Sequence, residues 1–258
     1  MEKTTRYLLI VLFGFIAQII DGALGMGYGV GSTTFLLSMG FGTALTSSCV
    51  HMSEIFTSFI SGVSHLKAGN VNKKIVTYLV ILGVPGGIVG AYASVKLQHL
   101  DMIKPFVSGI LLIMGVMIII KYVRKHSEIE YTIPRIRRLA PLGFIAAFID
   151  AVGGGGWGPI ATPMLIVTNS HPSKVIGSVN FAEFFVTLAI SITFFLALPG
   201  IDWNIVISLI IGGAIAAPIA PILTKKINHK ILGILVGSLI IFLSLRTILK
   251  AIGIGFFF

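Results

Sequence analysis

The chain has 258 residues, of which 55% are hydrophobic and 11% are charged, and its mean hydropathy is +1.00. Soluble domains carry about 25% charged residues, so this composition excludes an ordinary soluble protein. The formal net charge of +10 does not indicate nucleic-acid binding, because the basic residues lie between apolar runs, where the orientation signals of membrane proteins collect.

The apolar residues fall in runs that predict membrane-spanning helices. Crossing a bilayer takes about 20 residues in a helix, and the runs at 75–95, 105–120, 204–223 and 231–245 are apolar throughout or nearly so. We therefore expect an all-α, multi-pass protein of the cell membrane.

The chain also contains an internal repeat. When it is shifted by 129 residues, its halves align without a gap: Asp21 falls on Asp150, and Glu54 on Glu183. Three glycines of the first half fall on three of the second at the same shift. Matched acids and glycines are not expected by chance in an apolar sequence, so we predict two tandem homologous halves, 1–122 and 139–258. The basic linker 123–138 between them is expected to be cytoplasmic.

Each half predicts the same series of elements. In the first half these are a helix at 7–20, a glycine-rich break at 21–31, a short helix at 30–39, and longer helices from 43, at 75–95 and at 103–122. The second half repeats them at 139–149, 150–159, 160–168, from 172, at 204–223 and at 231–250. A helix such as 7–20 reaches roughly 21 Å, so the helices beside each break are expected to be too short to span.

The orientation of the halves depends on these short helices. If the two helices around a break form a hairpin, each half crosses the membrane an odd number of times, the halves are inverted, and both termini are extracytoplasmic. If they make a single crossing, both termini are inside. The basic residues partition well in both cases.

The glycine-rich breaks suggest an anion-binding site. Short helices interrupted by glycine at matching places of two halves are typical of transporter sites, and a helix N-terminus offers unpaired N–H groups and a partial positive charge to an anion. The alternative is that the glycines only allow close helix packing. The candidate substrate-binding residues are Gly25, Gly27, Tyr28, Gly29, Thr33, Gly154, Gly155, Gly156, Trp157, Gly158, Pro159 and Thr162.

Buried acids form a second group of candidates, for coupling or gating. Glu54 and Glu183 are expected near the bilayer centre, where a carboxylate costs about 2.5–3.5 kcal/mol. They would bind a coupling proton or shape the substrate path, or else only lock the packing. Asp21 and Asp150 end the first helix of each half and would cap the N–H groups of the break or take up a proton. His51 and Asn180, one turn before the glutamates, are their expected partners.

The second break reads IDAVGGGGWGPIATPMLI, followed by KVIGSVNFAEFF. It resembles the TauE/SafE sulfite exporter family, and the resemblance extends over nearly the whole chain. The first half, DGALGMGYGVGSTTFLL, is similar to the degenerate partner copy of that family and lacks the four glycines and the tryptophan. The resemblance implies transport of sulfite, organosulfonates or other small organic anions.

These observations predict a secondary transporter for a small anion, coupled to protons, with no cofactor or metal. The alternatives are an anion channel and an intramembrane enzyme that uses paired carboxylates. The sequence has no Gly-x-Gly-Asp order of intramembrane proteases and no cluster of metal ligands, so the enzyme is disfavoured. Oligomeric state remains open.

Overall fold

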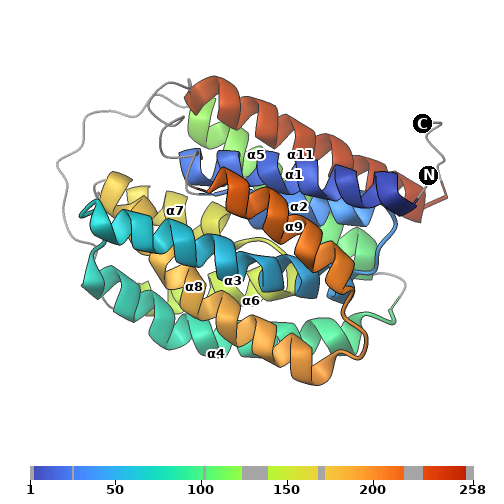
Figure 1. The fold of residues 1–258 in the computed structure, drawn as a ribbon, viewed down its shortest axis with the longest axis horizontal. Coiled ribbons are helices and arrows are strands. Elements are labelled where there is room, and N and C mark those ends of the chain that lie inside the picture. The colour runs from blue at the N-terminus through green and yellow to red at the C-terminus, as the bar shows by residue number, and fades with distance from the viewer. Residues whose placement is uncertain are drawn as a thin grey trace.

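The structure is a computed structural model that describes residues 3–24, 26–100, 103–123, 139–167, 172–217 and 229–253. In these ranges all regular structure is helical (Figure 1), as expected. The first half contains α1 (Lys3–Leu24), α2 (Tyr28–Ser38), α3 (Thr43–Lys67), α4 (Lys73–Leu97) and α5 (Ile103–Val123). The second half contains α6 (Leu139–Gly153), α7 (Trp157–Val167), α8 (Pro172–Ala197), α9 (Trp203–Ala216) and α11 (His229–Ala251).

The first helix is longer than expected. α1 has 22 residues and contains an apolar stretch, Thr4–Gly22, that is long enough to cross a membrane. The prediction that this helix ends at residue 20, too short to span, is wrong. Asp21 and Gly22 continue the helix, and the Asp21 carboxylate reaches forward to the next helix instead of ending its own.

The breaks are correspondingly shorter than expected, because α2 begins at Tyr28 and α7 at Trp157. Both helices therefore start two or three residues before the predicted positions. Gly25, most of the linker 123–138 and the predicted helical residues 218–223 lie outside the described ranges.

Several helices are suited to a bilayer by length and composition. Besides the stretch in α1, the long apolar spans are Lys73–Leu97 and Lys174–Ala197, and four shorter helices are also apolar. Large apolar side chains face outward on many helices, for example Leu8, Phe106, Leu196 and Phe242. An outer surface of this kind is stable in lipid and not in water.

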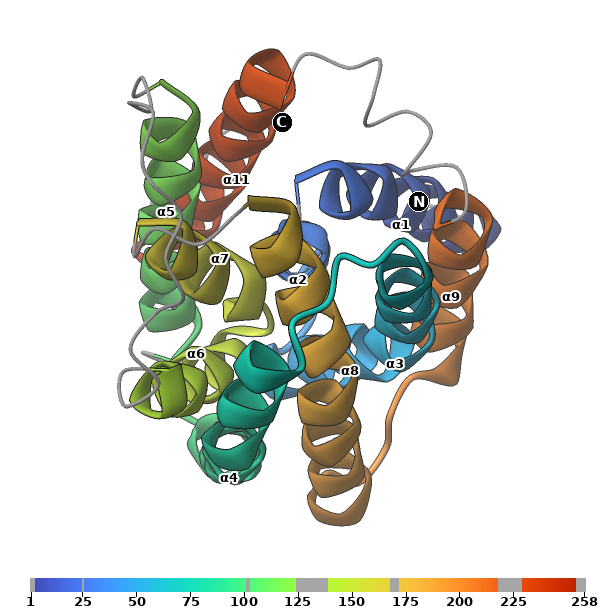
Figure 2. The same cartoon turned by 90° about the vertical axis from the view of Figure 1, so that its left-hand side faces the viewer.

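The two halves are interlocked in one bundle. The most extensive contacts join a helix of the first half to one of the second: α4 to α6, α5 to α11, α1 to α9, and α3 to α8. Figure 2 shows these pairs arranged around α2 and α7. Glycines allow the close approach, since a Cβ on Gly90 would lie 2.6 Å from the main-chain oxygen of Phe148. This contact agrees with the general role of regularly spaced small residues, which allow membrane helices to pack closely.

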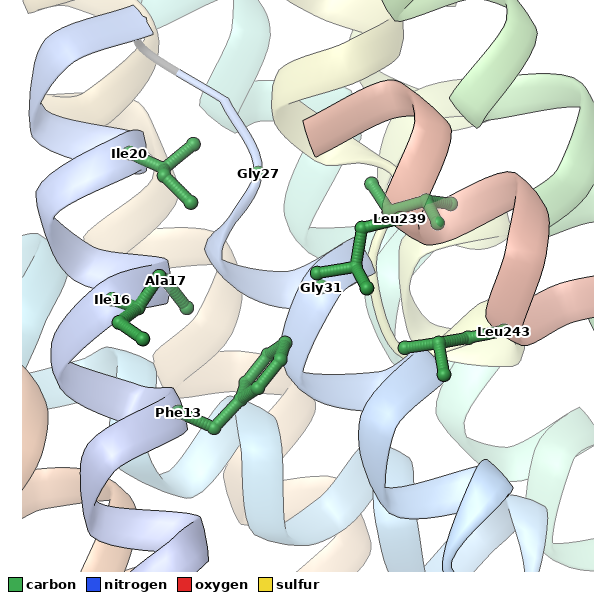
Figure 3. Close-up of a pocket in the computed structure, with 9 residues that line it drawn as sticks. Phe13, Ile16, Ala17, Ile20, Gly27, Gly31, Leu239 and Leu243 are labelled. Carbon is green, nitrogen blue, oxygen red and sulfur yellow. The ribbon is translucent and has the colours of Figure 1, made fainter. Parts of the chain in front are cut away.

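α1 and α2 form a helical hairpin (Figure 3). Near the turn, Ile20 contacts Gly27, whose φ of 126° is a conformation that favours glycine. Further along, Phe13 of α1 stacks on Phe35 of α2 with ring centroids 4.2 Å apart. The two helices therefore run in opposite directions, and the first break lies at the turn between them.

Candidate functional site

The two glycine-rich breaks meet inside the protein. Thr33 of α2 donates a hydrogen bond from its hydroxyl to the main-chain oxygen of Gly154. A Cβ on Gly29 would lie 3.0 Å from the Cα of Gly155, and a Cβ on Gly155 would overlap the main chain of Val30. All of these residues are buried. Two segments far apart in the sequence thus bring main chain against main chain.

Asp150 caps the N-terminus of α7. Its Oδ1 accepts hydrogen bonds from the backbone N–H of Gly156, at 2.6 Å, and of Trp157, at 3.1 Å. In the first half, Oδ1 of Asp21 lies 3.4 Å from the backbone nitrogen of Tyr28. Of the two roles expected for these aspartates, capping is the one seen in this structure. The first amides of α7 therefore already hold an internal carboxylate.

His51 of α3 pairs with Asp150. Its Nε2 lies 3.0 Å from Oδ2 of Asp150, and its Nδ1 lies 2.7 Å from the main-chain oxygen of Ser47. The two ring nitrogens thus lie between an oxygen of the second half and one of α3 itself. The expected pairing of His51 with Glu54 is wrong: the imidazole turns across the helix interface, toward the capped break.

Asn180, the counterpart of His51 in the second half, also has a partner other than the expected glutamate. Its Nδ2 donates to the main-chain oxygen of Ile176 at 3.0 Å, and its Oδ1 accepts from the hydroxyl of Ser61 at 3.3 Å. The first contact lies within α8, and the second joins α8 to α3. The polar bonding at the two matching positions is therefore different.

Glu54 lies directly against the first break. Its side chain is 3% exposed, and a Cβ on Gly29 would lie 2.8 Å from its Oε1. In the part of the chain that the structure describes, Oε2 has no hydrogen-bond partner. Glu183, in contrast, is only half-buried. Glu54 is in electrostatic range of three other carboxyl groups, those of Asp21, Asp150 and Glu183.

The aromatic residues that start α2 and α7 anchor these helices in the core. The hydroxyl of Tyr28 lies 3.0 Å from Oγ of Ser53 and 3.4 Å from the main-chain oxygen of Leu209. The indole Nε1 of Trp157 donates to the main-chain oxygen of Val179 at 3.1 Å. Protein groups thus take up the polar atoms of both side chains in this conformation, and a direct role in binding substrate stays a prediction.

The remaining candidates lie in the first turns of α7. Gly158 and Pro159 are the second and third residues of the helix, and Thr162 is its sixth. All three are buried. Proline is tolerated there because these first N–H groups have no acceptor within the helix.

A polar stripe on α3 was not recognised from the sequence. Ser47 donates to the main-chain oxygen of Ala151 at 2.7 Å, which ties α3 to the second break. The stripe could have been found, since its members recur at helical spacing of three and four residues. Its buried residues are Thr43, Ser47, His51, Glu54, Thr57, Ser58 and Ser61.

A pocket lies on the opposite side of α2 (Figure 3). Gly27 and Gly31 contribute to it, whereas Gly29 and Thr33 face the second break, as expected from the 3.6-residue period of a helix. Every other lining residue is apolar: Phe13, Ile16, Ala17, Ile20, Leu239, Ile240 and Leu243. A pocket of this kind offers nothing to an anion, so the polar chemistry lies on the Gly29 face.

Comparison with known proteins agrees with the family resemblance seen in the sequence. The family model "Sulfite exporter TauE/SafE" matches residues 10–247. The chain is 40% identical to the probable membrane transporter protein YtnM of Bacillus subtilis, over 95% of this chain and 83% of the relative. It is 27% identical to the probable membrane transporter protein YdhB of the same organism, over 67% of this chain and 69% of the relative. No solved structure shows significant similarity to the chain.

Proposed function

Because the chain belongs to the TauE/SafE sulfite exporter family of membrane transporters, we propose that it is a secondary transporter for a small anion. Sulfite, an organosulfonate or another sulfur-containing or organic anion fits the proposal. The sequence has no nucleotide-binding segment, so the energy comes from an ion gradient or from the gradient of the substrate.

The observation that carries this proposal is the contact between the two breaks. Helices α2 and α7 both begin where Gly29 meets Gly155, and helix N-termini attract anions. Among the buried side chains that the structure describes there is no Lys or Arg. The positive field for an anion therefore comes from the backbone, chiefly at the start of α2, since Asp150 already caps the start of α7.

Inverted halves are part of the proposal. The bounds of α2 and α7 differ by 129 residues at both ends, as the aligned sequences do. The α1–α2 hairpin gives the first half an odd number of crossings, and α1 begins at the same end of the bundle where α11 ends (Figure 1). These features support extracytoplasmic termini and a cytoplasmic linker, with the substrate site between the halves.

Proton coupling through the buried acids completes the proposal. A carboxyl group in the interior of a membrane protein is costly and is usually functional. In transporters such groups commonly relay protons, and here Glu54, Asp150 and Asp21 are buried beside the breaks.

The test is flux in proteoliposomes that contain the purified chain. Labelled sulfite, sulfonates and thiosulfate are offered with and without a proton gradient. We expect saturable uptake of at least one of them, accelerated by the gradient. Anion flux that does not saturate and does not respond to the gradient would favour a channel, and absence of flux for all three would refute the proposal.

A further inference from the structure

The two breaks differ in how completely their polar groups are bonded. At the second break, Asp150 bonds to two backbone amides of α7 and to His51. At the first break, the one hydrogen bond described for the Asp21 carboxylate is the 3.4 Å contact with Tyr28. Among the described residues, the second break is therefore held by more side-chain hydrogen bonds than the first.

Three buried polar groups near the first break have no partner in the described part of the chain. They are Oε1 of Gln18, Oγ of Ser32 and Oε2 of Glu54. Gln18 lies one helical turn before Asp21 on α1, and Ser32 lies one turn after Gly29 on α2. Unsatisfied buried polar groups are rare in folded proteins and need an explanation. A ligand that forms hydrogen bonds with these groups is such an explanation.

At the second break, the described residues contain no matching set of unpartnered groups. Shifted by 129 residues, Gln18 falls on Ala147 and Ser32 falls on Ala161. Both alanines are fully buried in the apolar core. The polar side chains at the second break, such as Asp150 and His51, are bonded to protein groups, whereas those at the first break are left with unpartnered atoms, which indicates that the ligand binds there.

The charges at the first break set a condition on an anionic ligand. Glu54 and Asp21 would both repel it if ionised, whereas a protonated carboxyl group donates a hydrogen bond to an oxyanion. α9 has no acidic or basic residue, and the lysines of α4 and α5 lie only at the helix ends. The titratable groups in electrostatic range of Glu54 on the surrounding helices are Asp21, Tyr28, Asp150 and Glu183. His51, on the same helix as Glu54, is bonded to Asp150.

We propose that the anion binds at the first break together with one proton, which is carried by Glu54; this rests on the proposed function. The Glu54 O–H donates to an oxygen of the anion, and the start of α2, Ser32 and Gln18 complete the site. No bond within the anion is broken. The proton is taken up with the anion on one side of the membrane and released with it on the other, so the binding of each favours that of the other.

A sulfonate substrate distinguishes a proton that is carried by the protein from one that is carried by the substrate itself. Methanesulfonate stays ionised, so a proton that moves with it is carried by the protein. In proteoliposomes, the wild type should accumulate labelled methanesulfonate in response to a proton gradient and should move protons with it. Glu54→Gln keeps an N–H donor, so it should still exchange labelled for unlabelled methanesulfonate but should lose gradient-driven accumulation.

The outcomes distinguish the two proposals. If the wild type moves none of methanesulfonate, sulfite and thiosulfate, the proposed function fails. If the wild type transports and Glu54→Gln still accumulates the anion with protons, only the assignment of the proton to Glu54 fails. Loss of proton movement in Glu183→Gln but not in Glu54→Gln would also overturn that assignment.

A second substitution tests the anion site if Glu54→Gln does not yield folded protein. Ser32→Ala removes one hydroxyl and should raise the KM for methanesulfonate about fivefold, the usual effect of losing one hydrogen bond. Ser191→Ala is the matched control, because Ser191 is also buried and without a partner, far along α8 from Glu183. Equal KM values in Ser32→Ala and the wild type would place the anion elsewhere.

Discussion

The imidazole of His51 and the carboxylate of Asp150 lie 3.0 Å apart, and neither side chain is more than 3% exposed. They come from different halves of the chain and join α3 to the cap of α7. Removing one partner of a buried polar pair leaves the other unsatisfied, which costs about 1–3 kcal/mol, or more if the group is charged.

We therefore expect His51→Ala to lower the thermal stability of the purified protein in detergent by several degrees. His99→Ala is the control, since His99 is exposed between α4 and α5, and it should leave the stability unchanged. Equal melting temperatures for the two variants would show that the pair does not hold the second break.

The contact between the breaks predicts a loss of transport on adding a single methyl group. Gly155→Ala places a Cβ where the main chain of Gly29 and Val30 lies, so α2 and α7 must move apart. We expect flux to fall below detection while the protein still inserts in the membrane and purifies as a folded species. Gly109→Ala on α5 has open space around its Cβ and should transport normally. Undiminished flux in Gly155→Ala would mean that the breaks need not touch.

The hydrogen bond of the Trp157 indole predicts an effect on stability. Trp157→Phe loses the hydrogen bond to Val179 and should destabilise the protein by about 1 kcal/mol. Trp203, the other tryptophan, is 51% exposed, so Trp203→Phe should have an effect within about 0.5 kcal/mol. Denaturation followed by circular dichroism in detergent measures both. A larger loss in Trp203→Phe would contradict the anchoring role.

The inverted arrangement predicts which loops face the same side of the membrane. In a Cys49→Ala background, single cysteines replace Lys67, at the end of α3, or Pro199, after α8; both positions are exposed. An impermeant thiol reagent added to intact cells should label the cysteine at position 199 and not the one at 67. If each break instead made a single crossing, both positions would be cytoplasmic, so absence of labelling at both, with labelling of both after permeabilisation, would exclude the inverted arrangement.

The sequence alone determined the helical class, the matched breaks and the family. The helical class and the breaks follow from local composition and from residues that recur at a fixed shift, and the family follows from the resemblance of the second break; none of these requires a fold to be known. The capping role of Asp21 and Asp150 was also within reach, because a carboxylate at a helix end beside glycine has few other bonding options.

Only the tertiary structure decided which side chains meet. His51 and Glu54 share a face of α3, yet His51 pairs with Asp150 and Glu54 lies against Gly29. Helical spacing gives the direction of a side chain and not the neighbour that packs there. The difference between the two breaks has both origins. The aligned sequences already show Gln18 and Ser32 opposite Ala147 and Ala161, whereas the bond between His51 and Asp150 depends on how α3 packs against the second break.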